Sequence, residues 1–199
     1  MSEQVIEIAK KMGREEVEKQ LAYQCAALIT GQKVSNTFIT SRNNIARLAA
    51  VFKGTSIAYR LLCVKENRAT FLLYRKGQLE RHLNRPEIKN RMEEYGYRDL
   101  SFGEMLRLLS QRYAAYICRG EEFPHEMGLF LGYPPEDVMG FVKEKGRKYK
   151  LSGYWKVYGD ADYCRKLFAS FDLAREQLIK LVAQGADMRW IAMAYEPAL

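Results

Sequence analysis

FPHEMGLFLGYPP occupies residues 123–135, and LSGYWKVY closes the same stretch at residues 151–158. This stretch holds three of the five prolines, one of the two histidines and one of the two tryptophans, so the unusual residues of the chain gather here. Glycine and proline in close succession are typical of short elements joined by tight turns. From residue 148 to residue 158 apolar and polar side chains alternate, and this pattern predicts a strand.

The prolines and glycines of this stretch also place two helices. Pro124 suits the first turn of a short helix over residues 125–131. Gly132 is expected to end that helix, because glycine tolerates the left-handed conformation that often follows a helix. A second helix is expected to begin at Pro134 and Pro135 and to end before Gly146. Acidic residues in its first turn and lysines in its last turn match the helix dipole.

Outward from this stretch, the clearest strands precede it. Residues 57–64 and 69–75 are rich in branched and aromatic side chains, and the polar residues 65–68 separate them. This arrangement predicts a β-hairpin. The polar residues 32–40 are expected to form a loop.

The remaining chain is dominated by helical periodicity. Apolar residues recur at helical spacing over residues 3–12, 17–29 and 160–182, and Ser101 with Glu104 has the spacing of a capping box. Together these patterns predict an α+β fold: one helix-rich domain over residues 1–199, around a small, mostly antiparallel sheet of about three strands.

The net charge of +8 is distributed in blocks. Residues 65–91 and residues 143–156 each carry a net charge of +5, whereas residues 92–142 carry −5. Basic blocks favour anionic partners, nucleic acid among them, although solvated faces of a basic protein would give the same counts. The outer face of the predicted last strand combines lysines with rings that can stack on bases: Lys148, Lys150, Tyr154, Lys156 and Tyr158.

The cysteines and the N-terminus point to the cytoplasm. Cys25, Cys63, Cys118 and Cys164 lie far apart, without the spacing of a metal or redox motif, which favours free thiols in a reducing compartment. The first residues lack the basic and apolar regions of a signal peptide. No apolar run approaches the ~20 residues that span a bilayer, so no membrane partner is expected.

The motif at residues 123–134 and the run at residues 153–158 resemble a bacterial family, the domain of unknown function numbered thirty-seven ninety-three. Tyr74-Arg75 and the turn Tyr95-Gly96-Tyr97 are similar to its middle section. The resemblance covers about residues 20–185 and leaves residues 186–199 as a C-terminal tail. It implies a small cytoplasmic bacterial protein and no particular activity. Ala27 and Val34 stand where the family usually has proline.

His125 and Glu126 are the residues that most suggest catalysis. A zinc protease helix needs a second histidine four residues after the first, and Leu129 stands there instead. An enzyme that uses His125 and Glu126 is one hypothesis. The alternative is structural, with Glu126 near a helix N-terminus and His125 bonded to a backbone carbonyl. Cys118 with His125 would be a further pair, but the neighbours of Cys118 suggest core.

The hypothesis favoured for function is a pocket for a small anionic ligand beside residues 123–134, in a binding protein without a recognisable catalytic residue, metal or cofactor. Nucleic-acid association through the basic blocks is the alternative. The pocket requires the strand ending at Arg75 to lie beside the strand at residues 148–158. Cations would then neutralise the ligand, aromatic rings would enclose it and a histidine would donate a hydrogen bond. The expected binding residues are Arg75, His125, Glu126, Tyr133, Trp155 and Lys156.

Overall fold

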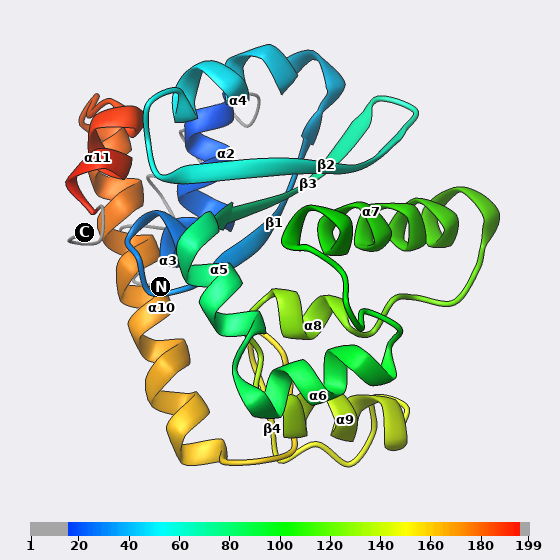
Figure 1. Ribbon diagram of the computed structural model, residues 1–199. Coiled ribbons are helices and arrows are strands. Elements are labelled where there is room, and N and C mark those ends of the chain that lie inside the picture. Colours follow the sequence, from blue (N-terminus) through cyan, green and yellow to red (C-terminus); the bar gives the residue numbers. More distant parts are fainter. Residues whose placement is uncertain (1–15, 196–199) are drawn as a thin grey trace. The chain divides into compact units, whose positions relative to one another are not determined.

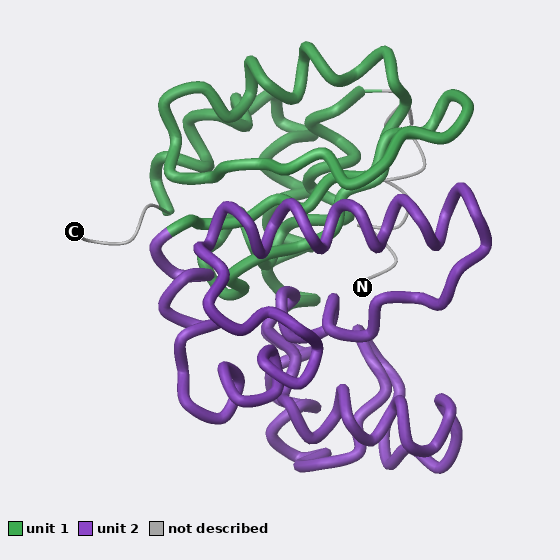
Figure 2. The backbone as a smooth tube through the Cα atoms, turned by 45° about the vertical axis from the view of Figure 1, so that its right-hand side comes forward, with its two compact units in different colours: residues 1–76, 171–199 green, residues 77–170 purple. Residues whose placement is uncertain are grey.

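The computed structural model describes residues 16–195, and these residues form two compact units (Figure 2). Unit 1 contains the described residues up to Lys76 together with those from Phe171 onward, and unit 2 contains Gly77–Ser170. The helix predicted at residues 3–12 lies outside the described residues. The prediction of a helix-rich α+β fold is confirmed, and the prediction of a single domain stays a prediction.

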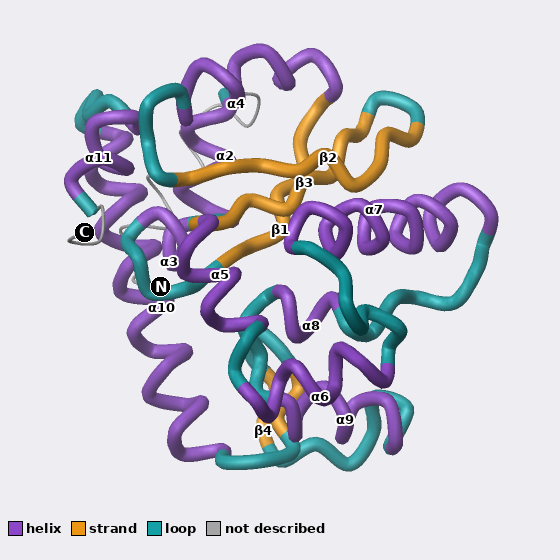
Figure 3. The backbone as a smooth tube through the Cα atoms, in the orientation of Figure 1, coloured by secondary structure: helices purple, strands orange, loops and turns teal. Residues whose placement is uncertain are grey.

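Unit 1 is built on a three-stranded antiparallel sheet in the order β1-β3-β2 (Figure 3). β3 lies in the centre, and Phe38 of β1 faces Phe71 of β3 in the register. The sheet and its helices share one hydrophobic core, which includes Leu21, Leu48 and Leu178. The elements of this unit are α2 (Val17–Gln24), α3 (Ala26–Ile29), β1 (Ser35–Ser41), η1 (Arg42–Asn44), α4 (Ile45–Phe52), β2 (Ile57–Lys65), β3 (Arg68–Arg75), the part of α10 (Ala161–Ala183) from Phe171 onward, and α11 (Met188–Ala194).

The hairpin predicted at residues 57–75 is confirmed. β2 pairs with β3 up to Lys65 and Arg68, so only Glu66 and Asn67 lie in the turn. Glu66 has a φ of 54°, the left-handed conformation that the favoured two-residue hairpin turns require.

The prediction of a loop over residues 32–40 was wrong, because Ser35–Ser41 forms the edge strand β1 (Figure 1). Its backbone groups pair with β3 on one side. On the other side, the Gln24 side-chain amide donates to the carbonyl of Ile39 and accepts from its N–H, both at 3.0 Å. These bonds take the place of a neighbouring strand at that position, which the hydropathy pattern does not reveal.

Unit 2 is mostly helical. Its elements are α5 (Lys76–Leu83, which begins at the boundary), α6 (Pro86–Glu94), α7 (Phe102–Arg119), α8 (Met127–Phe130), α9 (Pro135–Lys143), β4 (Leu151–Ser152), β5 (Lys156–Val157) and the first part of α10. The predicted capping box is present. The Ser101 side chain accepts from the N–H of Glu104, and the Glu104 carboxylate accepts from the N–H of Ser101.

Candidate functional site

The motif at residues 123–135 folds as the sequence predicts. The N–H of Met127 bonds the carbonyl of Pro124 and opens the short helix α8. Gly132 follows with a φ of 77°, where a side chain would be strained. Pro135 then occupies the first turn of α9. These turns bring His125 and Tyr133 to one cavity.

The strand predicted over residues 148–158 is not continuous, and this prediction was wrong. β4 and β5 form a two-stranded antiparallel hairpin that pairs Leu151 with Val157, and the chain turns between them. Gly153 lies in that turn against the ring of Phe168, which overlaps the place that a Cβ would occupy. The predicted pairing with the strand that ends at Arg75 is therefore also wrong, since that strand pairs with β1 and β2.

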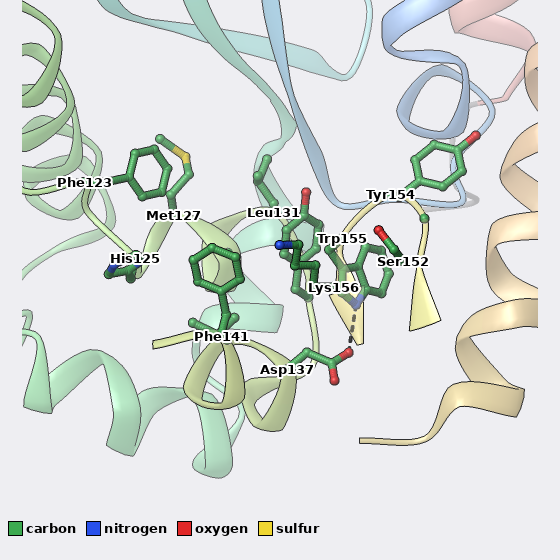
Figure 4. Close-up of a pocket in the computed structure, with 14 residues that line it drawn as sticks. Phe123, His125, Met127, Leu131, Asp137, Phe141, Ser152, Tyr154, Trp155 and Lys156 are labelled. Carbon is green, nitrogen blue, oxygen red and sulfur yellow. Dashed lines mark hydrogen bonds between the residues drawn. The ribbon is translucent and has the colours of Figure 1, made fainter. Parts of the chain in front are cut away.

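The hairpin, α8 and α9 enclose a cavity of about 400 Å³ (Figure 4). Its size lies within the range of natural small-molecule pockets, roughly 300–1,000 Å³. Four of the six predicted binding residues line it, and the remaining lining is mainly apolar. The lining residues are Phe123, His125, Met127, Gly128, Leu131, Tyr133, Asp137, Val138, Phe141, Ser152, Gly153, Tyr154, Trp155 and Lys156.

Aromatic rings form two sides of this cavity. Tyr133 stacks on Trp155 with ring centroids 4.5 Å apart and an angle of 24° between the rings. His125 contacts Phe141 and Phe123, each with centroids 5.6 Å apart. Burial raises the pKa of the Tyr133 hydroxyl to about 12, so this hydroxyl stays protonated at neutral pH. Planar molecules are the ligands that such walls hold best.

Lys156 is the only lysine or arginine among the lining residues. Its Nζ donates a 2.7 Å hydrogen bond to the carbonyl of Gly146. It also lies 5.0 Å from the centroid of the Tyr149 ring and 5.9 Å from that of Phe141. In Figure 4 the Lys156 side chain is seen among the lining residues, with its ammonium turned toward the side on which Phe141 lies. An ammonium has three donors, so the cavity has a positive charge that an anionic group can reach.

Asp137 fixes the cavity wall and is a residue whose role the sequence analysis missed. The residue is 2% exposed, and its carboxylate accepts from Trp155 Nε1 at 2.7 Å. It also accepts from the backbone N–H groups of Tyr158 and Gly159 at 2.6 and 2.8 Å. Because these donors satisfy it, Asp137 orients the Trp155 indole and is poorly suited to act as a base. The acidic first turn of α9 was the only available signal.

Glu126 does not line the cavity. Its buried carboxylate accepts from Arg112 Nη1 at 2.7 Å and from the Tyr97 hydroxyl at 3.1 Å. Burial, and next the Glu126 charge, raise the pKa of Tyr97, so that hydroxyl remains a donor. Arg112 belongs to α7, and the pair therefore fastens the motif to that helix. The Glu126 carboxylate and the His125 ring have different surroundings, and no contact between them supports an acid–base pair.

Arg75 lies in unit 1 and is not among the lining residues. The residue is 1% exposed. Its guanidinium donates to the carbonyls of Leu28 and Ile29 and bonds the Ser56 hydroxyl. Leu28 and Ile29 are the last residues of α3, whose carbonyls lack partners within the helix. Arg75 therefore caps α3, and nothing in these contacts supports the predicted role in ligand binding.

Other chemistry finds little support in the described residues. Within residues 16–195, no three His, Cys, Asp or Glu side chains gather as metal ligands do. Cys118 is exposed, which corrects the expectation that it belongs to the core. Phe141 is 36% exposed and lines the cavity. None of the described helices has the length and apolar content needed to cross a membrane.

In a comparison with protein-family models, residues 21–192 match the family described as "Protein of unknown function (DUF3793)". The chain belongs to this family. The match confirms the resemblance. It extends from within α2 to within α11, so it includes parts of both units. Comparisons with the curated proteins and with the solved structures found no match. For this member of DUF3793, function is therefore argued from the cavity.

Proposed function

We propose that this member of DUF3793 binds a small anionic molecule with a planar, apolar body in the cavity of unit 2. The observation that supports this most is the lining, because aromatic rings enclose the space and one ammonium, that of Lys156, reaches it. A purely apolar cavity would need no lysine, and a site for a simple inorganic anion would need more donors than rings.

Five of the lining residues have proposed roles in binding. Trp155 and Tyr133 would cover one face of the planar body, and Phe141 would cover the opposite side. Lys156 would neutralise the acidic group. His125 would donate or accept one hydrogen bond, which fixes the orientation of the ligand.

The proposal separates the residues that bind from those that hold the site. Asp137 and Glu126 are buried, and their carboxylates already accept hydrogen bonds from protein donors. A second anion beside either carboxylate would be repelled. The ligand's acidic group is therefore expected on the side of Lys156 and Tyr149.

We also propose that the protein works in the reducing cytoplasm of a bacterial cell. All four cysteines are free, and three of them, Cys25, Cys63 and Cys164, are buried. Free thiols persist best in a reducing compartment. Burial raises the pKa of Cys25 to about 12, which keeps that thiol protonated and inert.

The test is a thermal-unfolding screen of the full chain against small aromatic carboxylates and aromatic phosphates, compared with their neutral amides. Acids of the right shape should raise the melting temperature, and the neutral analogues should do so less. Lys156→Met keeps the length of the side chain but removes the charge, so it should abolish the preference for acids. Lys166→Met, at an exposed lysine on α10, is the matched control. Equal shifts for acids and amides in the wild type would contradict the proposal.

A further inference from the structure

The segment Lys143–Lys150, which follows the cavity in the chain, concentrates positive charge. Its five cations are exposed: Lys143, Lys145, Arg147, Lys148 and Lys150. Glu144 is the only acidic residue among them, and it pairs with Lys148 at 3.4 Å. Within the described part of the chain, no ion pair engages Lys143, Lys145 or Arg147. We call this segment the basic rim.

The basic rim borders the cavity directly. The carbonyl of Gly146 accepts the hydrogen bond from Lys156 Nζ. A Cβ placed on Gly146 would lie 3.1 Å from Cε2 of Phe141, and both Phe141 and Lys156 line the cavity. A ligand that reaches Lys156 inside the cavity is therefore at the rim as soon as it extends past that residue.

The backbone of the rim is wound into a tight turn. Lys145, Gly146 and Lys148 have φ values of 51°, 70° and 54°, which place three of four consecutive residues in the left-handed region. Lysine rarely adopts this conformation, and such residues gather at functional sites more often than elsewhere. The turn keeps several cations close together on the surface.

An exposed ring adds to this charge. Tyr149 is 44% exposed, and the Lys156 ammonium lies over its ring. A ring next to cations provides a stacking surface beside groups that attract phosphate. The cavity provides further rings beyond Lys156, so stacking and charge continue from the inside of the site to its edge.

From this continuity we infer that the basic rim is a phosphate subsite, and that the ligand of the cavity is an aromatic base that carries a phosphate. This inference rests on the proposed function. The base would lie between Phe141 and Trp155, and the phosphate would lie on Lys143, Lys145 and Arg147. A free nucleotide and the end of a single-stranded nucleic acid share this chemistry. An anionic membrane is the less favoured partner, because binding to a lipid surface would leave the aromatic cavity without a role.

Trp155 provides the measurement. Its indole lines the cavity, whereas the second tryptophan, Trp190, is 72% exposed in unit 1. In the full chain with Trp190→Phe, the fluorescence of Trp155 is followed as each probe is added. The probes are the four nucleoside 5′-monophosphates, the four matching nucleosides, and a short single-stranded DNA. Vesicles with and without phosphatidylserine are tested by co-sedimentation.

The decisive variant replaces Lys143, Lys145 and Arg147 with glutamine. The control variant carries the same loss of charge at three exposed cations of the same unit, with Arg85, Lys89 and Lys166 replaced by glutamine. We expect the rim variant to bind monophosphates about tenfold or more weakly, with a smaller salt dependence, because fewer cations neutralise the phosphate. Nucleoside binding should not change, and the control variant should match the wild type.

Each result of these binding measurements points to a different occupant of the rim and the cavity. Saturation by a monophosphate alone supports a free nucleotide, and binding seen only with DNA, weakened by both the rim variant and Lys156→Met, supports a strand end. If monophosphates bind more tightly than nucleosides, and Lys156→Met removes that difference while the rim variant keeps it, the phosphate subsite is refuted and the proposed function stands. If nucleosides and monophosphates bind equally well, both are refuted. If no probe affects Trp155, the base-binding part is refuted as well. Vesicle binding that only the rim variant loses, without nucleotide binding, would assign the rim to a membrane surface and overturn the inference.

Discussion

The indole N–H of Trp155 donates a 2.7 Å hydrogen bond to the carboxylate of Asp137, eighteen residues earlier in the chain. This bond ties the hairpin to α9. It fixes the indole plane on which Tyr133 stacks, and so it shapes one wall of the cavity. The same carboxylate accepts two backbone N–H groups after β5, which makes Asp137 the centre of the hairpin's attachment.

Asp137→Ala should therefore destabilise the protein strongly. It leaves the Trp155 N–H and two backbone N–H groups without their acceptor in a buried place. We expect a loss of about 3 kcal/mol or more in the free energy of unfolding, measured in urea. In a double-mutant cycle, Trp155→Phe should be coupled to Asp137→Ala by about 1 kcal/mol or more. Additive losses from the two substitutions would show that the bond contributes nothing.

Glu126 should matter for stability and much less for binding. The variant Arg112→Met removes the cation that pairs with Glu126. The buried Glu126 carboxylate then keeps the Tyr97 hydroxyl as its hydrogen-bond donor. The Arg112 side chain is 37% exposed, so we expect a loss of about 2 kcal/mol, less than for a fully buried pair. Chemical unfolding measures this loss. Arg107→Met is the control, because its exposed pair with Glu104 should contribute little to stability. A ligand affinity that falls while stability is unchanged would contradict the structural role.

Two helical glycines should respond to alanine in opposite directions. On α7, a Cβ at Gly103 would meet nothing within 4 Å, so Gly103→Ala should stabilise the protein by about 0.5 kcal/mol through helix propensity. On α9, a Cβ at Gly140 would overlap the Tyr158 side chain. Gly140→Ala should therefore destabilise by about 1–3 kcal/mol, and Tyr158→Ala in the same chain should relieve part of that loss. Thermal unfolding measures the stability of the three variants, and equal effects at both glycines would refute the packing described.

His82 should make stability depend on pH. It is buried, its Nε2 lies 3.0 Å from the carbonyl oxygen of Leu129, and desolvation is the main cause that lowers its pKa from 6.5. Because the folded-state pKa is below the unfolded one, the unfolded chain takes up the proton first as pH falls. The contribution of neutral His82 to the free energy of unfolding is therefore fully present above about pH 6.5 and is lost as the pH falls below it. Chemical unfolding at pH 7.5 and pH 5.5 measures how much the free energy of unfolding changes with pH. His82→Gln should make that change smaller. An unchanged pH dependence would assign it to other groups.

Thiol reactivity should single out one cysteine. Cys118 is exposed, whereas Cys25, Cys63 and Cys164 are buried. Burial, with Asp137 as the next cause, raises the pKa of Cys164 to about 11. At pH 8 a thiol reagent should label one cysteine quickly in the native protein and all four after denaturation. Cys118→Ser should remove the fast phase, and rapid labelling of a second thiol would contradict the burial described.

Local signals in the sequence were enough to predict much of the fold. The capping box at Ser101, the turn at Gly132 and the hairpin at residues 57–75 depend on neighbours within a few positions, and each is present. β1 was missed because its stability comes from β3 and from the Gln24 side chain, partners distant in sequence. The strand at residues 148–158 was predicted as continuous because the alternation there persists through the turn at Gly153.

The candidate site was predictable in part for the same reason. His125, Tyr133, Trp155 and Lys156 belong to one unusual stretch, and the cavity gathers all four. Arg75 was added on the assumption that two strands pair, and the sheet order contradicts that assumption. Glu126 was grouped with His125 because they adjoin in sequence. Its partner Arg112 lies fourteen residues earlier, on another helix, and no pattern of spacing identifies it.

Native mass spectrometry tests whether Lys156 holds an anionic ligand in this cavity. The wild type, Lys156→Met and Lys166→Met are each incubated with a small-molecule extract of the expression host and then desalted. We expect one added mass on the wild type and on Lys166→Met, and we expect Lys156→Met not to retain it. No added mass on any of the three proteins, or the same mass on all three, would contradict an anionic ligand held by Lys156 in this cavity.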